Sequence, residues 1–204
     1  ANACTGNQGD KDAEQMSAVA AEAIGVGAEQ VLVMSTGVIG ELLDASRITA
    51  HLPAMANSGV LDGFEKAARA IMTTDTYPKL ATRTVDIGGT SVTINGFCKG
   101  AGMIAPDMAT MLSFVFTDAA IDGAVLQRLL SSHVETTFNC MTVDGDTSTS
   151  DTCLVFATGK AAHRGQHRTD PSIAGVPGAG DPQLTTAGVN RADVWVFDPA
   201  SLGS

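Results

Sequence analysis

The chain has 204 residues, 44% of them apolar and 17% charged, with a mean hydropathy of +0.14, a composition typical of a folded globular protein. Its net charge of −10, with only 12 Lys and Arg residues, disfavours an extended nucleic-acid surface, because phosphates are bound by clustered cations. We therefore expect one domain, or one large lobe, that acts on small molecules.

The cysteines and the apolar runs indicate a cytoplasmic protein. Cys4, Cys98, Cys140 and Cys153 are widely spaced and form no CxxC pair, so the sequence predicts neither a metal site nor a disulfide framework. No apolar run reaches the roughly 18 residues of a membrane span, and no signal-peptide layout is present. We expect a soluble protein without membrane or nucleic-acid partners. Because the chain begins with Ala1, we also expect it to be part of a longer product.

The first third of the sequence predicts two helices and a strand. Apolar residues recur every three or four positions over 12–24 and 61–71, as in helices with one buried face, and Gly25 is expected to end the first helix. The apolar run 30–34 predicts a buried strand. It is followed by a turn at 35–37 that is expected to lead into a helix.

The middle of the chain predicts a sheet and one further helix. A Gly-Gly pair separates two alternating β-branched runs over 84–94, which predicts a hairpin at the edge of a sheet. Buried strands are expected over 111–116 and 153–157, and Asp122 is placed to cap a helix between them. The fold class expected from this order of elements is mixed α/β.

The character of the sequence changes near residue 159. Residues 1–158 contain the periodic elements and are the expected core segment. Residues 159–204 are rich in Gly and Pro and keep no helical or strand period, so we expect an irregular tail with one short strand over 193–197.

One candidate nucleophile lies where a Gly-rich loop meets an apolar strand, within residues 99–112. Thr110 is a weak nucleophile unless a base is close, and cleavage of the bond after Ala109 would supply one by freeing the Thr110 α-amine. That amine has a pKa of about 8 and accepts a proton near neutral pH. Local sequence alone favours the plainer interpretation, in which Thr110 is an ordinary residue at the start of a strand.

Three other segments are rich in hydroxyl groups. The turn at 35–40 offers hydroxyl and backbone N–H donors for an oxyanion, or simply caps a helix. Residues 73–79 and 142–152 contain many short polar side chains. The second partly resembles a calcium loop, but Thr149 stands where such a loop needs Gly and the terminal Glu is missing. We therefore interpret it as a hydrogen-bonded loop that supports a site.

Five segments of the chain occur in the order seen in one enzyme family. They are residues 2–6, 35–40, 74–76, 99–112 and 142–152. Together they resemble the ornithine acetyltransferases, also called bifunctional glutamate and amino-acid N-acetyltransferases, which cleave themselves before a Thr in an Ala-Thr-Met-Leu context. The resemblance implies cleavage between Ala109 and Thr110. It then implies transfer of acetyl from N-acetylornithine to glutamate through acetyl-Thr110, in arginine biosynthesis and without a cofactor.

The same resemblance implies roles for individual residues. Thr36 and Gly37 would stabilise the oxyanion, and Thr76, Lys99 and Thr110 would contact the substrate. The implied fold is a layered sandwich of mixed sheets and helices, built from two paired chains after cleavage and assembled into a homo-oligomer.

The resemblance covers the central part of the family's chain. A Gly-Glu-Gly-Ala-Thr-Lys segment and the first part of the family's N-terminal chain have no counterpart here, so we expect the chain to be incomplete at both ends. Two alternatives follow: a non-catalytic remnant that binds a ligand or a partner, and a hydrolase in which water replaces glutamate.

Overall fold

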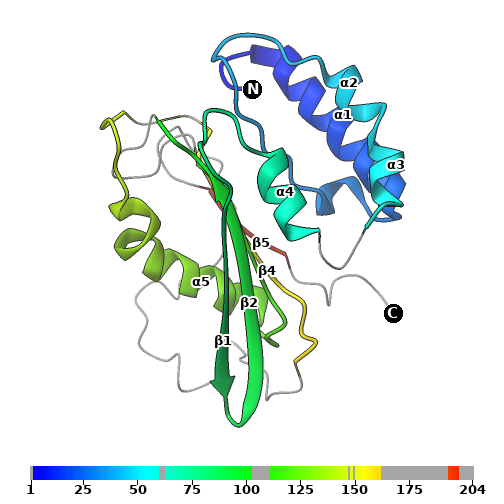
Figure 1. Cartoon of the computed structure of the whole chain (residues 1–204). Coiled ribbons are helices and arrows are strands. Elements are labelled where there is room, and N and C mark those ends of the chain that lie inside the picture. The colour runs from blue at the N-terminus through cyan, green and yellow to red at the C-terminus, as the bar shows by residue number, and fades with distance from the viewer. Residues whose placement is uncertain are drawn as a thin grey trace. The chain divides into compact units, whose positions relative to one another are not determined.

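The computed structural model describes residues 2–59, 63–102, 111–146, 148, 150–161 and 193–197. The chain divides into two compact units, residues 1–66 and 67–204, and each is described by itself. The expected mixed α/β class is confirmed, because helices and a mixed sheet are both present (Figure 1). The layered sandwich of two cleaved chains stays a prediction. No helix in the described ranges has the length and apolar character needed to cross a membrane.

The longest helix of the first unit is α1 (Gly6–Ile24). It confirms the helix predicted over 12–24 and begins six residues earlier. Met16 and Ala21 are among the residues on its buried face. Gly25 ends the helix as predicted: its φ of 75° is a left-handed conformation that favours glycine, and its N–H donates to the Ala21 carbonyl at 2.8 Å.

Shorter helices accompany α1 in the first unit. They are η1 (Ala28–Gln30), α2 (Ala45–Thr49) and α3 (Leu52–Ala56), and all three contact α1. The buried strand predicted over 30–34 is wrong, because these residues form no strand and Val33 is 36% exposed. A strand needs a hydrogen-bonding neighbour, and this run pairs with no other strand in the part of the chain that is described. The helix expected directly after 35–37 is likewise wrong, since α2 begins only at Ala45.

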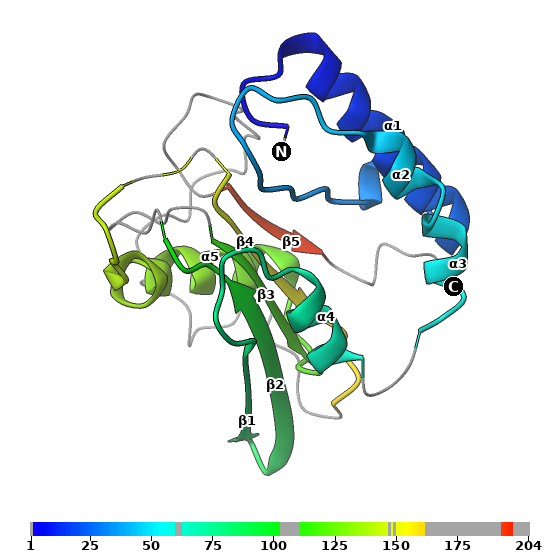
Figure 2. The same cartoon turned by 45° about the horizontal axis from the view of Figure 1, so that its top comes forward.

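The second unit is built on a five-stranded sheet, in the order β1-β2-β3-β4-β5 (Figure 2). The strands are β1 (Lys79–Ile87), β2 (Thr90–Lys99), β3 (Leu112–Thr117), β4 (Thr152–Ala157) and β5 (Asp193–Phe197). The first three strands pair antiparallel, and β3–β4 and β4–β5 pair parallel. The predicted strands at 111–116, 153–157 and 193–197 are confirmed. α4 (Phe64–Ala70) confirms the helix predicted over 61–71, whose residues 61–62 lie outside the described ranges.

The predicted hairpin is confirmed in β1 and β2. Gly88 and Gly89 have φ angles of 59° and 85°, the positive values that a tight two-residue hairpin turn requires. The Asp86 carboxylate accepts a hydrogen bond from the Gly89 N–H at 3.0 Å. β1 lies at the edge of the sheet, as expected, and most of its side chains are exposed.

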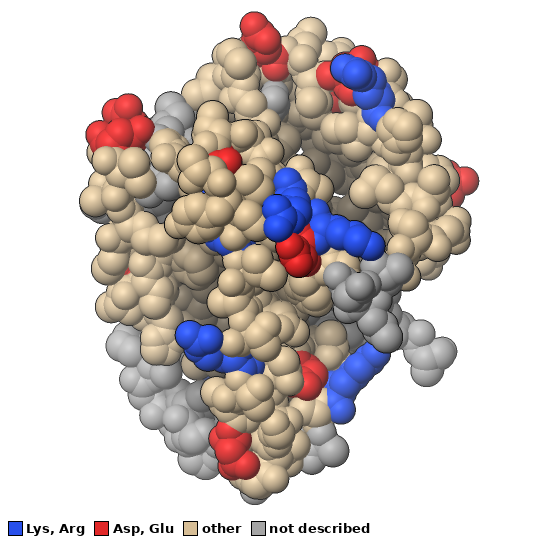
Figure 3. All heavy atoms as spheres, in the orientation of Figure 1, with Lys and Arg blue, Asp and Glu red and all other residues tan. Residues whose placement is uncertain are grey.

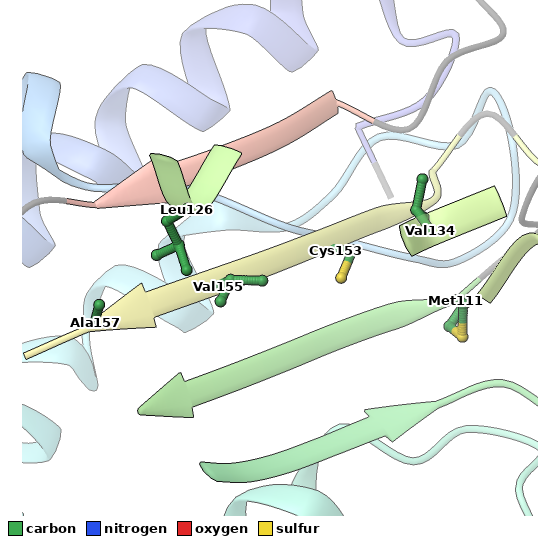
Figure 4. Close-up of a cluster of buried hydrophobic side chains, with 6 residues drawn as sticks. All are labelled: Met111, Leu126, Val134, Cys153, Val155 and Ala157. Carbon is green, nitrogen blue, oxygen red and sulfur yellow. The ribbon is translucent and has the colours of Figure 1, made fainter. Parts of the chain in front are cut away.

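The core of the second unit lies between the sheet and the helix α5 (Gly123–His133), which runs on into η2 (Val134–Thr136). A further short helix, η3 (Phe138–Cys140), follows. Met111, directly before β3, and side chains from β4 and these helices form one buried cluster (Figure 4): Met111, Leu126, Val134, Cys153, Val155 and Ala157. On β2, β3 and β4, phenylalanine rings stack in pairs, with Phe97–Phe114 and Phe116–Phe156 centroids each 4.9 Å apart. The packed strands β3 and β4 fix the positions of the residues at their ends.

Asp122 caps α5, as predicted: its carboxylate accepts a hydrogen bond from the Ala124 N–H at 2.9 Å. Asp122→Ala should lower the free energy of unfolding by about 1 kcal/mol, because an N-terminal amide of the helix loses its acceptor. Urea unfolding at pH 7 measures this change. Asp122→Asn keeps an acceptor and should retain most of the stability; equal losses in the two variants would contradict the capping role.

Candidate functional site

In the first unit, the first two segments of the resemblance lie side by side. The Asn2 N–H donates to the Ser35 hydroxyl oxygen at 3.0 Å, and the Gly40 N–H donates to the Ala3 carbonyl at 2.9 Å. These bonds join residues more than 30 positions apart and hold the turn at 35–40 against the start of the chain.

Thr36 and Gly37 lie within this turn. Thr36 is half-buried and Gly37 is exposed. Neither the Thr36 hydroxyl nor the Gly37 N–H forms a hydrogen bond within the described ranges, so both donors can turn to an outside acceptor. Such donors are what an oxyanion requires, although the role of the two residues stays a prediction.

In the second unit, the ends of three strands, β2, β3 and β4, meet at one end of the sheet. Lys99 at the end of β2 pairs with Leu112 on β3, which pairs with Thr152 on β4. The Thr152 N–H donates to the Met111 carbonyl at 2.9 Å, and the Met111 N–H donates to Asp151 Oδ1 at 2.6 Å. The cation Lys99 and the carboxylate Asp151 are therefore held on either side of the start of β3.

The segment 74–76 is joined to this end of the sheet by Asp75. Its Oδ1 accepts hydrogen bonds from Lys79 Nζ at 2.6 Å and from the Gly100 N–H at 2.8 Å, and its Oδ2 accepts one from the Thr73 N–H at 3.3 Å. Burial by itself would raise the pKa of Asp75, but these hydrogen bonds and the Lys79 charge outweigh it and lower the pKa. Asp75 is thus an ionised anchor for the loop before β1.

Thr76, predicted to contact substrate, follows Asp75 directly and is exposed. Its neighbour Tyr77 is also exposed, and Lys79 Nζ lies 4.8 Å from the centre of the Tyr77 ring. Asp75 holds the backbone of this loop, so the Thr76 hydroxyl is presented from a fixed turn. Its contact with substrate stays a prediction.

Lys99, the other predicted substrate contact, is only 1% exposed. Burial lowers the pKa of its ammonium, while the charges of Asp75 and Asp151 act in the opposite direction. A cation in such a place binds a carboxylate more strongly than one in bulk water, because the surrounding dielectric constant is lower.

Asp151 was not singled out by the sequence. Burial raises its pKa to about 6, even though the Met111 N–H, the Lys99 charge and the Ser148 N–H all favour the ionised form. Its Oδ2 is buried and has no hydrogen-bond partner among the described residues. Its position two residues before the strand predicted over 153–157 was visible in the sequence, but the burial of its Oδ2 depends on the pairing of β3 with β4.

Ala109 and Thr110 lie outside the described residues, so the cleavage site and the nucleophile stay predictions. Within the described part of the chain, no group of three or more His, Cys, Asp or Glu side chains is placed to hold a metal ion. On the face shown in Figure 3, acidic and basic side chains are interspersed and form no continuous basic region among the described residues.

The ArgJ family model matches residues 1–175. The chain belongs to the ArgJ family. The resemblance seen in the sequence is thereby confirmed. The chain is 55% identical over 184 residues to the arginine biosynthesis bifunctional protein ArgJ of Rhizobium meliloti, covering 90% of this chain and 43% of that protein. It is 58% identical over 166 residues to the Agrobacterium fabrum protein of the same name, covering 81% of this chain and 40% of that protein.

A solved structure of the arginine biosynthesis bifunctional protein ArgJ from Bacillus halodurans is also similar. It is 40% identical, covers 52% of this chain and 56% of that chain, and superposes with a TM-score of 0.47. The chain spans about two fifths of the length of the curated ArgJ relatives named above.

Replacing Asp75 should destabilise the folded protein. Asp75→Asn removes the charge that holds Lys79 and Gly100, so the free energy of unfolding should fall by about 2 kcal/mol at pH 7. Because the folded-state pKa of Asp75 is lowered, its contribution is present above pH 3.8 and is lost as the pH falls further. Urea unfolding at pH 7 and pH 3 should show a difference from wild type that shrinks in acid. The exposed Asp146→Asn is the control, and an equal loss in both variants would contradict the anchoring role.

Proposed function

We propose that this chain provides the acetyl-transferring core of an ArgJ enzyme of arginine biosynthesis, acting in the cytoplasm. The chain cleaves itself between Ala109 and Thr110, and Thr110 then carries the acetyl group from N-acetylornithine to glutamate. The products are ornithine and N-acetylglutamate, and no cofactor takes part. The family match over residues 1–175 supports this proposal.

In the first half of the cycle, Thr110 Oγ attacks the acetyl carbonyl of N-acetylornithine while its α-amine accepts the hydroxyl proton. The ornithine nitrogen takes up a proton and departs, leaving an acetyl ester on Thr110. In the second half, the glutamate amine attacks this ester and regenerates the hydroxyl. The two half-reactions account for a donor and an acceptor that use one site in turn.

Thr36 and Gly37 are the proposed oxyanion donors, and Thr76 and Lys99 the proposed substrate contacts. Each preorganised oxyanion donor contributes on the order of 3 kcal/mol to the lowering of the barrier. The buried Lys99 ammonium suits the α-carboxylate that N-acetylornithine and glutamate share.

The observation that supports the proposal most is the meeting of three resemblance segments, 74–76, 99–112 and 142–152, at one end of the sheet. Lys99 and Met111 belong to the second and Asp151 to the third, and strand pairing and the hydrogen bond from Met111 to Asp151 bring them together. Asp75 attaches the first segment to Gly100 at the same end. An ordinary loop that leads into a strand does not require a lysine and two carboxylates to be held together at the end of a sheet.

The proposal is tested with N-acetylornithine labelled in its acetyl group. We expect label on the protein, at Thr110, and its transfer to glutamate as N-acetylglutamate. A protein that takes up no label would support the non-catalytic remnant instead. Release of labelled acetate without any need for glutamate would support the hydrolase.

We also propose that the two cleaved pieces stay paired and assemble into a homo-oligomer. Strand pairing supports the first part, because β2 precedes the cut and β3 follows it, and the two are hydrogen-bonded over six residue pairs. Size-exclusion chromatography of the cleaved protein should therefore elute both pieces together.

A further inference from the structure

The proposed self-cleavage needs a proton acceptor that the transfer reaction does not need. During transfer, the free α-amine of Thr110 accepts the hydroxyl proton. Before cleavage, the same nitrogen belongs to the peptide bond with Ala109 and has no basic lone pair. Another group must therefore accept the Thr110 hydroxyl proton during self-cleavage. This inference rests on the proposed function, since it concerns the step that creates the Thr110 amine.

Two ionisable side chains, the half-buried Asp151 and the buried Lys99, lie close to Met111, the residue that follows Thr110 in the chain. Asp151 contacts it directly, with Oδ1 2.6 Å from the Met111 nitrogen. Lys99 is the other, on the neighbouring strand β2. Burial lowers the pKa of Lys99, against the opposing charges of Asp75 and Asp151, and a lysine must lose its ammonium proton before it can accept another. A carboxylate accepts a proton at neutral pH, so Asp151 is the better candidate.

We infer that Asp151 is the proton acceptor of self-cleavage. Its carboxylate takes the Thr110 hydroxyl proton as Oγ bonds to the Ala109 carbonyl carbon. The carbon–nitrogen bond then breaks, and the carboxylic acid returns the proton to the departing nitrogen, which becomes the α-amine. Water hydrolyses the resulting ester, leaving a carboxylate on Ala109 and the hydroxyl on Thr110.

The surroundings of Asp151 suit this task. The Met111 N–H holds Oδ1, while the buried Oδ2 has no hydrogen-bond partner in the described ranges and keeps its lone pairs for a proton. A pKa of about 6 makes Asp151 a stronger base than an ordinary carboxylate and still leaves it ionised at pH 7.5. Lys99 on β2 supplies the positive charge that faces it, and Asp75, before β1, attracts the same ammonium.

The test follows cleavage of newly made full-length chain. The protein is labelled in a short cell-free translation pulse and diluted into buffers between pH 5 and 8.5, and the intact chain is followed by denaturing electrophoresis. Wild type should cleave about tenfold more slowly for each pH unit below 6 and reach a plateau above pH 7. Asp151→Asn keeps an acceptor for the Met111 N–H but no base, and should cleave at least about 100-fold more slowly at pH 7.5.

Three further variants make the assignment specific. Asp151→Glu keeps a carboxylate and should recover part of the rate. Asp146→Asn, an exposed change in the same segment, should cleave like wild type. Lys99→Met removes the positive charge that favours the ionised form of Asp151, so the midpoint of its pH profile should move upward from about 6. The midpoint of the Lys99→Met profile tests the role of Asp151 even if thermal unfolding shows that Asp151→Asn does not fold.

Separate results contradict the two proposals. If folded Asp151→Asn cleaves at the wild-type rate with the same pH profile, the role of Asp151 is wrong and the proposed function stands. An unchanged midpoint in Lys99→Met also contradicts it. If wild type stays intact at every pH, both the self-cleavage and its proton acceptor are wrong.

Discussion

Thr110→Ala should remain an intact chain and take up no acetyl label, with transfer reduced at least about 1,000-fold. The change removes the only hydroxyl that the proposed chemistry uses, first to attack the Ala109 carbonyl and then to hold the acetyl group. Loss of a nucleophile that acts in both steps has effects of this size or larger. Label from N-acetylornithine, measured per mole of protein, gives the result directly.

Two controls separate chemistry from folding. Thr110→Ser keeps a hydroxyl and should cleave and transfer at a reduced rate. Thr84→Ala changes an exposed threonine on the edge strand β1 and should behave as wild type. Label on Thr110→Ala equal to that on wild type would show that another residue is the nucleophile.

Lys99→Met should reduce kcat/KM for N-acetylornithine about 100-fold, mainly through a higher KM. Methionine fills a similar volume but offers no charge to a substrate carboxylate, and a buried charge-assisted hydrogen bond of this kind contributes about 3 kcal/mol. Rates are expressed per mole of Thr110 N-terminus, so that slower cleavage does not count as slower transfer.

Lys160→Met is the matched control, because it removes the same charge from an exposed position after β4. It should change kcat/KM less than twofold. Lys99→Arg keeps the charge in a larger group and should fall between wild type and Lys99→Met. If KM stays at the wild-type value in Lys99→Met, the residue does not bind the substrate carboxylate.

Local sequence signals predicted the elements whose causes are local. The Gly88-Gly89 turn and the Asp122 cap each depend on a few neighbouring residues, and both are confirmed. The prediction of a strand over 30–34 was wrong, because an apolar stretch becomes a strand only beside a partner strand. Its own residues do not encode that partner.

For a related reason, some residues of the site were predicted from the sequence and others were not. Lys99 was identified from the family resemblance, and the structure adds that it is buried between carboxylates. Asp75 and Asp151 were visible only as members of polar segments. Their importance comes from burial and from hydrogen bonds to Gly100 and Met111, across 25 and 40 residues of sequence. Such long-range contacts arise from the pairing of β2, β3 and β4 and leave no local pattern.

Self-cleavage before Thr110 is the central claim, and N-terminal sequencing of the purified full-length protein tests it most directly. Denaturing electrophoresis should separate two pieces, and sequencing the one that lacks the original N-terminus should read Thr-Met-Leu-Ser-Phe from residue 110. A chain that remains a single intact piece after prolonged incubation at pH 7.5, while folded by circular dichroism, would contradict the claim.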